Sequence, residues 1–182
     1  MSGPNINKRF SLLKERENGR LITIDPRFTE TSEVATEHYY ITPGKDAFLL
    51  LAILNVIFSD GTETTGSLPV ENMNELKAIS LQFGPHKISK VVDISADIII
   101  ELARELTRTK QAAIYGRLGT STQEYGALCS WLIYVINIVA GNMDVEGGMM
   151  FTRPAIDVAG LGALVSEVQS FDTQRSRVRK LP

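Results

Sequence analysis

The chain has 182 residues, of which 43% are hydrophobic and 22% charged, and its mean hydropathy is close to zero. This composition excludes an intrinsically disordered chain, a collagen-like chain and a disulfide scaffold. The net charge of −2 excludes a strong global attraction for nucleic acid. The single cysteine, Cys129, excludes an internal disulfide and a multi-cysteine metal site within this chain.

Two apolar runs, 48–58 and 127–140, come closest to a membrane span. Both are shorter than the roughly 20 apolar residues that a bilayer requires, so each predicts a buried helix. The first ten residues lack the apolar stretch of an export signal. The sequence therefore favours a cytoplasmic chain, with a periplasmic location left open for a parent protein that carries a signal.

The first part of the chain predicts a helix followed by a strand. Residues 5–18 carry apolar side chains on one side, and Gly19 follows as a stop. Residues 20–24 alternate and include β-branched side chains, which predicts a short strand that ends at Asp25. This order is typical of part of an α/β unit.

A second strand and a buried helix are expected next. Residues 29–37 are polar and predict a loop or a short helical turn, and 38–41 form a second β-rich run. The apolar residues 47–58 predict a helix, with Asp46 in its first turn, where a carboxylate is favoured by the unpaired N–H groups.

The middle of the chain continues the alternation. Residues 72–82 predict a helix that ends at 84–85, a Gly-Pro pair, and residues 95–110 predict a helix with Ser95 as its N-cap. The apolar residues 111–115 predict a buried strand. Helices alternating with strands favour a parallel α/β sheet.

Glycine is concentrated in the last third of the chain. Eight of the 14 glycines lie between Gly116 and Gly162, around the apolar helix that contains Trp131. Such turns suggest a backbone that closely approaches a ligand or another domain. Tight loops between helices are an equally good interpretation of this pattern.

No catalytic constellation is present in the sequence. It contains no nucleophile elbow, no metalloprotease helix motif, no phosphate-binding Walker loop and no paired-cysteine motif. Cys129 lies within the apolar helix, which favours a buried structural thiol, and His38 and His86 have no partner at a suggestive spacing. We therefore assign no catalytic residue and no metal ligand to this chain.

One short segment is typical of nucleotide binding. A carboxylate at the end of an α/β strand can accept hydrogen bonds from a ribose, and Asp25 occupies such a position. Arg27 is placed to stack on a base or to contact a phosphate. The alternatives are structural: Asp25 and Arg27 form a turn that ends a strand, and Gly44 and Asp46 only begin a helix.

Two sequence blocks form an ordered pattern. The first block is 21–31 (LITIDPRFTET) with 43–47 (PGKDA). The second block consists of 115–119 (YGRLG), Thr122, Gln123, Asn137, 141–144 (GNMD), Gly147 and Gly148. In this order the two blocks resemble the molybdopterin oxidoreductases of the formate dehydrogenase, nitrate reductase and dimethyl sulfoxide reductase group, in which a threonine usually stands in place of Lys45.

The resemblance implies an incomplete Rossmann-like parallel sheet with flanking helices. It also implies molybdopterin guanine dinucleotide as cofactor, with molybdenum or tungsten held by two pterins. By the same resemblance, Asp25 and Arg27 contact the guanosine end, Gly44 lets the backbone approach the nucleotide, and Asp46 faces it. A carboxylate suits guanine, whose N1–H and N2–H groups both donate.

The second block is expected on the cofactor side of a neighbouring domain. The resemblance puts Gln123 near the pterin, and it makes Gly141, Asn142, Gly147 and Gly148 a cofactor-side loop. We accordingly divide the chain into three parts: 1–115, a partial nucleotide-binding α/β domain; 116–165, part of the neighbouring cofactor-binding domain; and 166–182, a polar interdomain or tail segment.

The resemblance further implies an internal fragment of a larger enzyme, inactive alone. Its partners are the remainder of the parent enzyme, which supplies the metal-ligating residue and the iron–sulfur cluster, and a second copy through exposed apolar surface. One alternative is a stand-alone α/β protein that binds a nucleotide or a partner without redox activity. Another is a subunit of a split enzyme whose other parts are separate chains.

Overall fold

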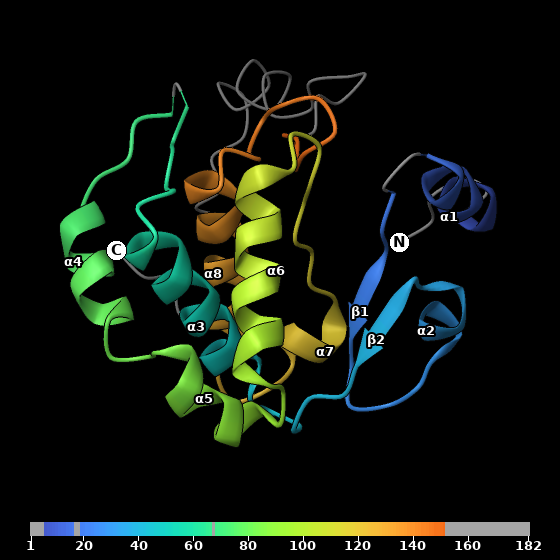
Figure 1. Ribbon diagram of the computed structural model, residues 1–182, viewed down its shortest axis with the longest axis horizontal. Coiled ribbons are helices and arrows are strands. Elements are labelled where there is room, and N and C mark those ends of the chain that lie inside the picture. Colours follow the sequence, from blue (N-terminus) through green and yellow to red (C-terminus); the bar gives the residue numbers. More distant parts are fainter. Residues whose placement is uncertain (1–5, 17–18, 67, 152–182) are drawn as a thin grey trace, which may run out of the picture. The chain divides into compact units, whose positions relative to one another are not determined.

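The computed structural model describes residues 6–16, 19–66 and 68–151, and Figure 1 shows their arrangement. By its contacts the chain divides into two units, Met1–Met150 and Phe151–Pro182. Of the second unit, only Phe151 belongs to the described residues. The predicted tail 166–182 therefore lies outside the described residues. The elements in chain order are α1 (Ile6–Glu15), β1 (Ile22–Ile24), α2 (Glu30–Val34), β2 (Glu37–Tyr39), α3 (Asp46–Ser59), α4 (Met73–Ser80), α5 (Pro85–Val92), α6 (Ala96–Arg108), α7 (Leu118–Ser121) and α8 (Gly126–Val139).

Two parallel strands form the sheet of the described residues. In β1 and β2, Ile22 lies opposite Glu37 and Ile24 opposite Tyr39, and α2 connects the strands. Parallel strands need such a crossover connection, and Thr29 caps α2 by accepting a hydrogen bond from the Ser32 N–H. The predicted α/β class, with a parallel sheet and flanking helices, is confirmed.

Helix α3 is the centre of the hydrophobic core. It contacts α4, α5, α6 and α8, and eleven of its residues are buried. Because neighbouring helices cover nearly its whole circumference, an almost uniformly apolar sequence is what this position requires. The two apolar runs of the sequence are therefore core helices, α3 and α8, and no helix in the described part of the chain is long and apolar enough to cross a membrane.

The helix predictions hold except at one proline. The predicted N-cap of α6 is confirmed, because the Ser95 hydroxyl accepts from the Ile98 N–H at 3.3 Å. Pro85, taken from the sequence as the end of a helix, also begins the next one, α5. Proline is favoured at the first position of a helix, where its missing N–H costs nothing.

The predicted buried strand at 111–115 is wrong. These residues join no strand ladder in the described structure, and their side chains alternate between half-buried and exposed. The side-chain amide of Asn137 on α8 makes the backbone hydrogen bonds that a neighbouring strand would otherwise make. Its Oδ1 accepts from the Ile114 N–H at 3.1 Å, and its Nδ2 donates to the Ile114 carbonyl at 2.8 Å.

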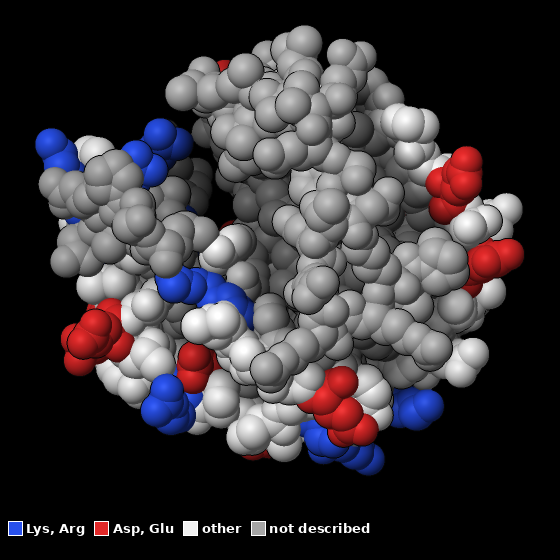
Figure 2. Space-filling model, turned by 180° about the vertical axis from the view of Figure 1, so that it is seen from behind, with Lys and Arg blue, Asp and Glu red and all other residues white. Residues whose placement is uncertain are grey.

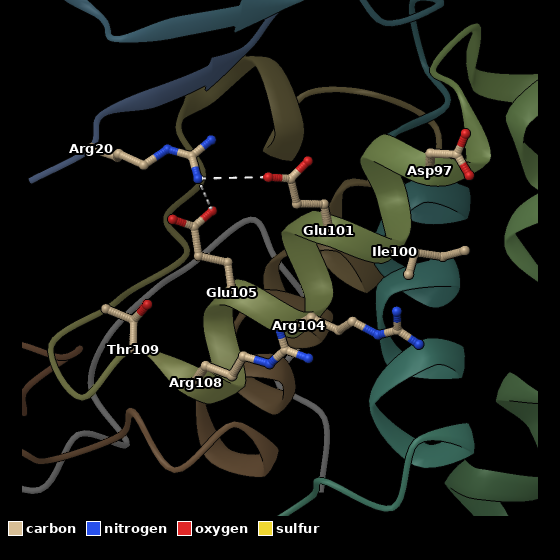
Figure 3. A pocket seen from close by; sticks show the side chains of 8 residues that line it. All are labelled: Arg20, Asp97, Ile100, Glu101, Arg104, Glu105, Arg108 and Thr109. Atoms are coloured by element: carbon tan, nitrogen blue, oxygen red, sulfur yellow. Dashed lines mark hydrogen bonds and ion pairs between the residues drawn. The ribbon is translucent and has the colours of Figure 1, made fainter. Parts of the chain in front are cut away.

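A cluster of charged side chains joins the sheet to α6. Arg20 donates to Glu37 on β2 and to Glu105 on α6, the latter at 2.7 Å, and it lies 4.0 Å from Glu101 (Figure 3). The Tyr39 hydroxyl also donates to Glu37, which raises the pKa of Tyr39 to about 12. The same hydrogen bond, together with Arg20, lowers the pKa of Glu37 below its ordinary value.

On the face seen in Figure 2, acidic and basic side chains of the described residues are interspersed. This distribution agrees with the small net charge of the chain.

We predict that Asn137→Leu lowers the free energy of unfolding by about 1–3 kcal/mol, because it leaves the backbone groups of Ile114 without their partner. Asn55→Leu is the matched control, since Asn55 is also buried on a core helix but donates only to the Ser80 carbonyl. Urea denaturation followed by Trp131 fluorescence measures both. Equal losses in the two variants would contradict the proposed role of Asn137.

We predict that Glu37→Gln lowers the melting temperature at pH 7 and has no effect at low pH. Because folding lowers the pKa of Glu37, its carboxylate stabilises the folded state fully at pH values above the ordinary pKa of 4.5. This stabilisation is lost as the pH falls through the pKa of Glu37 in the folded state. Thermal melts between pH 3 and pH 7 measure the difference. Glu33→Gln on exposed α2 is the control and should change little at any pH, and an equal effect of both variants at pH 7 would refute the prediction.

Candidate functional site

The first candidate region is the turn that follows β1. Its backbone is fixed by the Asp25 N–H, which donates to the Tyr39 carbonyl at 3.2 Å, and by the Arg27 N–H, which donates to Asp25 Oδ1 at 2.8 Å. This leaves Oδ2 of the half-buried Asp25 without a hydrogen bond in the described structure. Arg27 is exposed, and its guanidinium has no described ion-pair partner. The turn thus presents a free carboxylate oxygen and a free cation at the carboxyl end of the sheet.

A second region lies where β2 leads into α3. Gly44 has φ +75°, in the left-handed region that favours glycine, and this turns the chain into the helix. Asp46 begins α3, and Lys45 before it makes no side-chain cap. The Lys45 ammonium instead lies 5.6 Å from the centre of the Phe48 ring, within the range of a cation–π contact.

Gln123 meets this turn from a distant part of the sequence. Its Nε2 donates to Asp46 Oδ2 at 2.8 Å and to the Thr120 carbonyl at 3.1 Å. A Cβ on Gly44 would lie 3.7 Å from Gln123 Oε1, and no other atom of the described part of the chain outside the neighbouring residues lies within 4 Å of it. The structure therefore brings together three of the predicted residues, Gly44, Asp46 and Gln123, across 77 positions of sequence between the last two.

Two features of this cluster bear on what it can bind. Gln123 Oε1 is buried and has no hydrogen-bond partner among the described residues. Leaving a buried acceptor unpaired costs free energy, so this oxygen is available to a donor. Cys129 Sγ lies 3.7 Å from Gln123 Nε2. Burial, and then the nearby charge of Asp46, raises the pKa of Cys129. Cys129 is fully buried, as predicted, and its raised pKa disfavours the reactive thiolate.

The glycine-rich segment after α8 forms a separate structure. Gly141 and Gly147 both have positive φ, and a Cβ on Gly148 would lie 2.2 Å from the Asn142 carbonyl oxygen. Asn142 is buried, and its Nδ2 donates to the Leu106 carbonyl at the end of α6 at 2.8 Å. Close packing within the chain therefore requires glycine at these positions.

The structure does not bring this segment to Gln123. Gln123 precedes the first turn of α8, whereas Gly141 follows its last turn. A helix of 14 residues is about 21 Å long, so the two lie at opposite ends of α8. It stays a prediction that a cofactor is bound by Gly141, Asn142, Gly147 and Gly148. The domain boundary after residue 115 also stays a prediction. Helices α3 and α8, which lie on opposite sides of that boundary in the sequence, pack on each other.

A row of aromatic side chains near the carboxyl ends of β1 and β2 was not predicted from the sequence. The Phe28 and His38 rings meet edge to face at 5.4 Å between centres, and the His38 and Tyr40 rings do so at 4.5 Å. Phe28 and Tyr40 are more than half exposed. The i, i+2 spacing of His38 and Tyr40 was the available signal, because it places both on one face of a strand.

The polar side chains of the candidate regions include carboxylates, an arginine and a primary amide. Within the described residues no three His, Cys, Asp or Glu side chains gather as potential metal ligands. Carboxylates, arginines and primary amides are hydrogen-bonding groups suited to a polar organic ligand.

Comparisons with known proteins identify relatives for most of the chain. No family model matches it. It is 29% identical over 170 residues to the dimethyl sulfoxide reductase DmsA of Haemophilus influenzae, covering 81% of this chain and 21% of the relative. It is 31% identical over 140 residues to an F420-dependent formate dehydrogenase subunit alpha of Methanococcus maripaludis, covering 75% of this chain and 21% of that subunit.

A third relative and a solved structure agree with these. The thiosulfate reductase molybdopterin-containing subunit PhsA of Salmonella typhimurium is 26% identical, with 81% of this chain and 20% of the relative covered. The acetylene hydratase of Pelobacter acetylenicus shares the fold, with a TM-score of 0.67 at 22% identity over 75% of this chain and 19% of the hydratase. The chain thus spans about a fifth of the length of the curated relatives it matches. It belongs to the molybdopterin oxidoreductase family.

Proposed function

We propose that this chain forms part of the site that holds molybdopterin guanine dinucleotide in a molybdenum or tungsten oxidoreductase. The observation that carries the proposal is the cluster of Gly44, Asp46 and Gln123, in which the buried Gln123 Oε1 has no partner within residues 6–16, 19–66 and 68–151. When bound, the cofactor supplies two-electron redox chemistry at its metal. The part of this chain is to bind and orient the organic portion.

The guanosine end is assigned to the turn after β1. Asp25 Oδ2 is free to accept from guanine, whose N1–H and N2–H groups form an adjacent pair of donors. Oδ1 is already engaged with the Arg27 N–H, so the carboxylate is held in place before a ligand arrives. Such pre-organisation reduces the entropy that binding costs. The exposed Arg27 guanidinium is suited to a phosphate or to the face of the base.

The second region is assigned to the pterin. Pterins carry ring N–H and amino groups, which are donors that fit the unpaired Gln123 Oε1. The hydrogen bond to Asp46 fixes which end of the Gln123 amide points away from α3. A Cβ at Gly44 would meet the Gln123 Oε1 at 3.7 Å, so the absence of a side chain at Gly44 leaves this acceptor uncovered on that side. The residues present therefore fit the group.

We further propose that the remaining parts of a longer enzyme complete the site. The curated relatives are about five times as long as the matched segment, and those named as subunits function within larger enzymes. In this role the chain contributes cofactor contacts and does not turn over a substrate by itself.

We predict that the chain binds GMP more tightly than AMP, and that Asp25→Asn weakens GMP binding by roughly tenfold to a hundredfold. The estimate follows from about 1.5–3 kcal/mol for a hydrogen bond to a charged group. Asparagine retains an oxygen that accepts from the Arg27 N–H, so the turn is preserved. Isothermal titration calorimetry measures the affinities.

Glu30→Gln is the matched control, because Glu30 begins the neighbouring exposed helix α2 and should leave GMP affinity unchanged. Equal affinity for GMP and AMP, or an Asp25→Asn variant that binds as the unchanged chain does, would rule out the guanosine assignment.

A further inference from the structure

Met149 places its thioether sulfur against the amide that holds the segment 111–115. Met149 Sδ lies 3.4 Å from Asn137 Nδ2, and Asn137 is fully buried on α8. Two backbone hydrogen bonds fix Met149 itself. Its N–H donates to the Asn142 carbonyl at 2.8 Å, and its carbonyl accepts from the Asp144 N–H at 2.7 Å. The sulfur therefore has a defined position beside the Asn137 amide.

The Asn137 amide has more acceptors around it than hydrogens to donate. Nδ2 carries two N–H groups, and three acceptors surround it: the carbonyls of Ile114 and Ile133, each at 2.8 Å, and Met149 Sδ. A thioether sulfur is a weak acceptor, so the two carbonyls hold the N–H groups. Ile133 lies within α8 and stays close to Asn137, whereas Ile114 belongs to an extended segment that joins no strand ladder in the described structure. A stronger acceptor at the sulfur would therefore compete with the Ile114 carbonyl.

Oxidation creates such an acceptor at the sulfur. Met149 is only partly buried, so a small oxidant has access to it. When hydrogen peroxide reacts with a thioether, the O–O bond breaks, an S–O bond forms, and the two electrons that the sulfur gives up reduce the peroxide to water. The product, methionine sulfoxide, carries a polar oxygen on the same sulfur. This oxygen accepts hydrogen bonds more strongly than the thioether does.

We propose that Met149 is a site of reversible oxidation, and that its sulfoxide releases the segment 111–115 from Asn137. The sulfoxide oxygen takes the N–H that the Ile114 carbonyl accepts in the reduced protein. The amide turns toward this new acceptor, so its Oδ1 also leaves the Ile114 N–H, which it now holds at 3.1 Å. One change of acceptor thus breaks both hydrogen bonds of Ile114. Methionine sulfoxide reductases restore the thioether and with it the original contacts.

The released segment adjoins the candidate site. It leads through Gly116 into α7, and a Cβ on Gly116 would lie 2.5 Å from the Thr120 hydroxyl oxygen. The Thr120 carbonyl in turn accepts from Gln123 Nε2 at 3.1 Å. Oxidation of Met149 therefore loosens the packing that supports Gln123. Neither the oxidation nor the release requires a bound cofactor.

Hydrogen peroxide added to the full chain tests the proposal, with mass spectrometry of peptides to measure oxidation at each methionine. We expect Met149 to gain one oxygen. We also expect the Ile114 amide to exchange its hydrogen about tenfold faster or more, which is the effect of losing one hydrogen bond on a local opening equilibrium. The amide of Ile53, which is 1% exposed on α3, reports on global unfolding and should keep its rate. Sulfoxide reductases should restore the rate at Ile114.

Met150 supplies the matched control. It is 62% exposed, so peroxide oxidises it as well, but it makes no hydrogen bond to Asn137 in the part of the chain that the structure describes. Met150→Leu should therefore keep the response at Ile114. Met149→Leu, which preserves the apolar volume but cannot be oxidised, should abolish the response. Met149→Gln offers a carbonyl acceptor in place of the sulfoxide and should show the faster exchange without peroxide.

Four results would overturn the proposal. The first two are an Ile114 amide that keeps its rate although Met149 is oxidised, and a response of equal size in Met149→Leu. The third is a rise at Ile53 that matches the rise at Ile114, because oxidation would then destabilise the whole fold rather than release one segment. The fourth is a Met149 that stays reduced under conditions that oxidise Met150.

Discussion

The burial of α3 is the constraint on which the described structure depends. Four helices pack around it, and its first residue, Asp46, carries the contact to Gln123. A core helix covered on all sides has little freedom to rotate or shift, because interiors are packed at near-crystalline density. The packing of the core therefore fixes the geometry of the candidate site. Gly44, Asp46 and Gln123 are positioned by the packing of α3 and α8 rather than by a flexible loop.

Elements with a strong local signal were predictable from sequence. The apolar run of α3, the Ser95 cap of α6 and the turn at Asp25 each follow from periodicity, capping or proline chemistry within a few residues. The contacts that bring Gln123 to Asp46 follow from tertiary packing, which no local pattern encodes. The failure at 111–115 has the same origin, because a β-prone sequence forms a ladder only where a neighbouring strand pairs with it.

The glycines of the two predicted site regions have different structural reasons. At Gly44 the space above the glycine is open apart from the Gln123 side chain, and an acceptor there is unused. At Gly147 and Gly148 the chain itself fills the space that a side chain would take. Glycine is thus compatible with a ligand in the first case and is required by the fold in the second. The same residue type therefore carries different information in the turn before α3 and in the segment after α8.

The central place of α3 also bears on the order in which the protein is made. Its largest partners in the core include α8, which ends at residue 139, whereas α3 ends at residue 59. At 5–20 residues per second, a ribosome needs roughly 4–16 s to complete that interval. Throughout it, a nearly continuous apolar helix lacks the part of its cover that α8 supplies in the finished fold. The nascent chain is therefore a natural client for chaperones that shield apolar segments during synthesis.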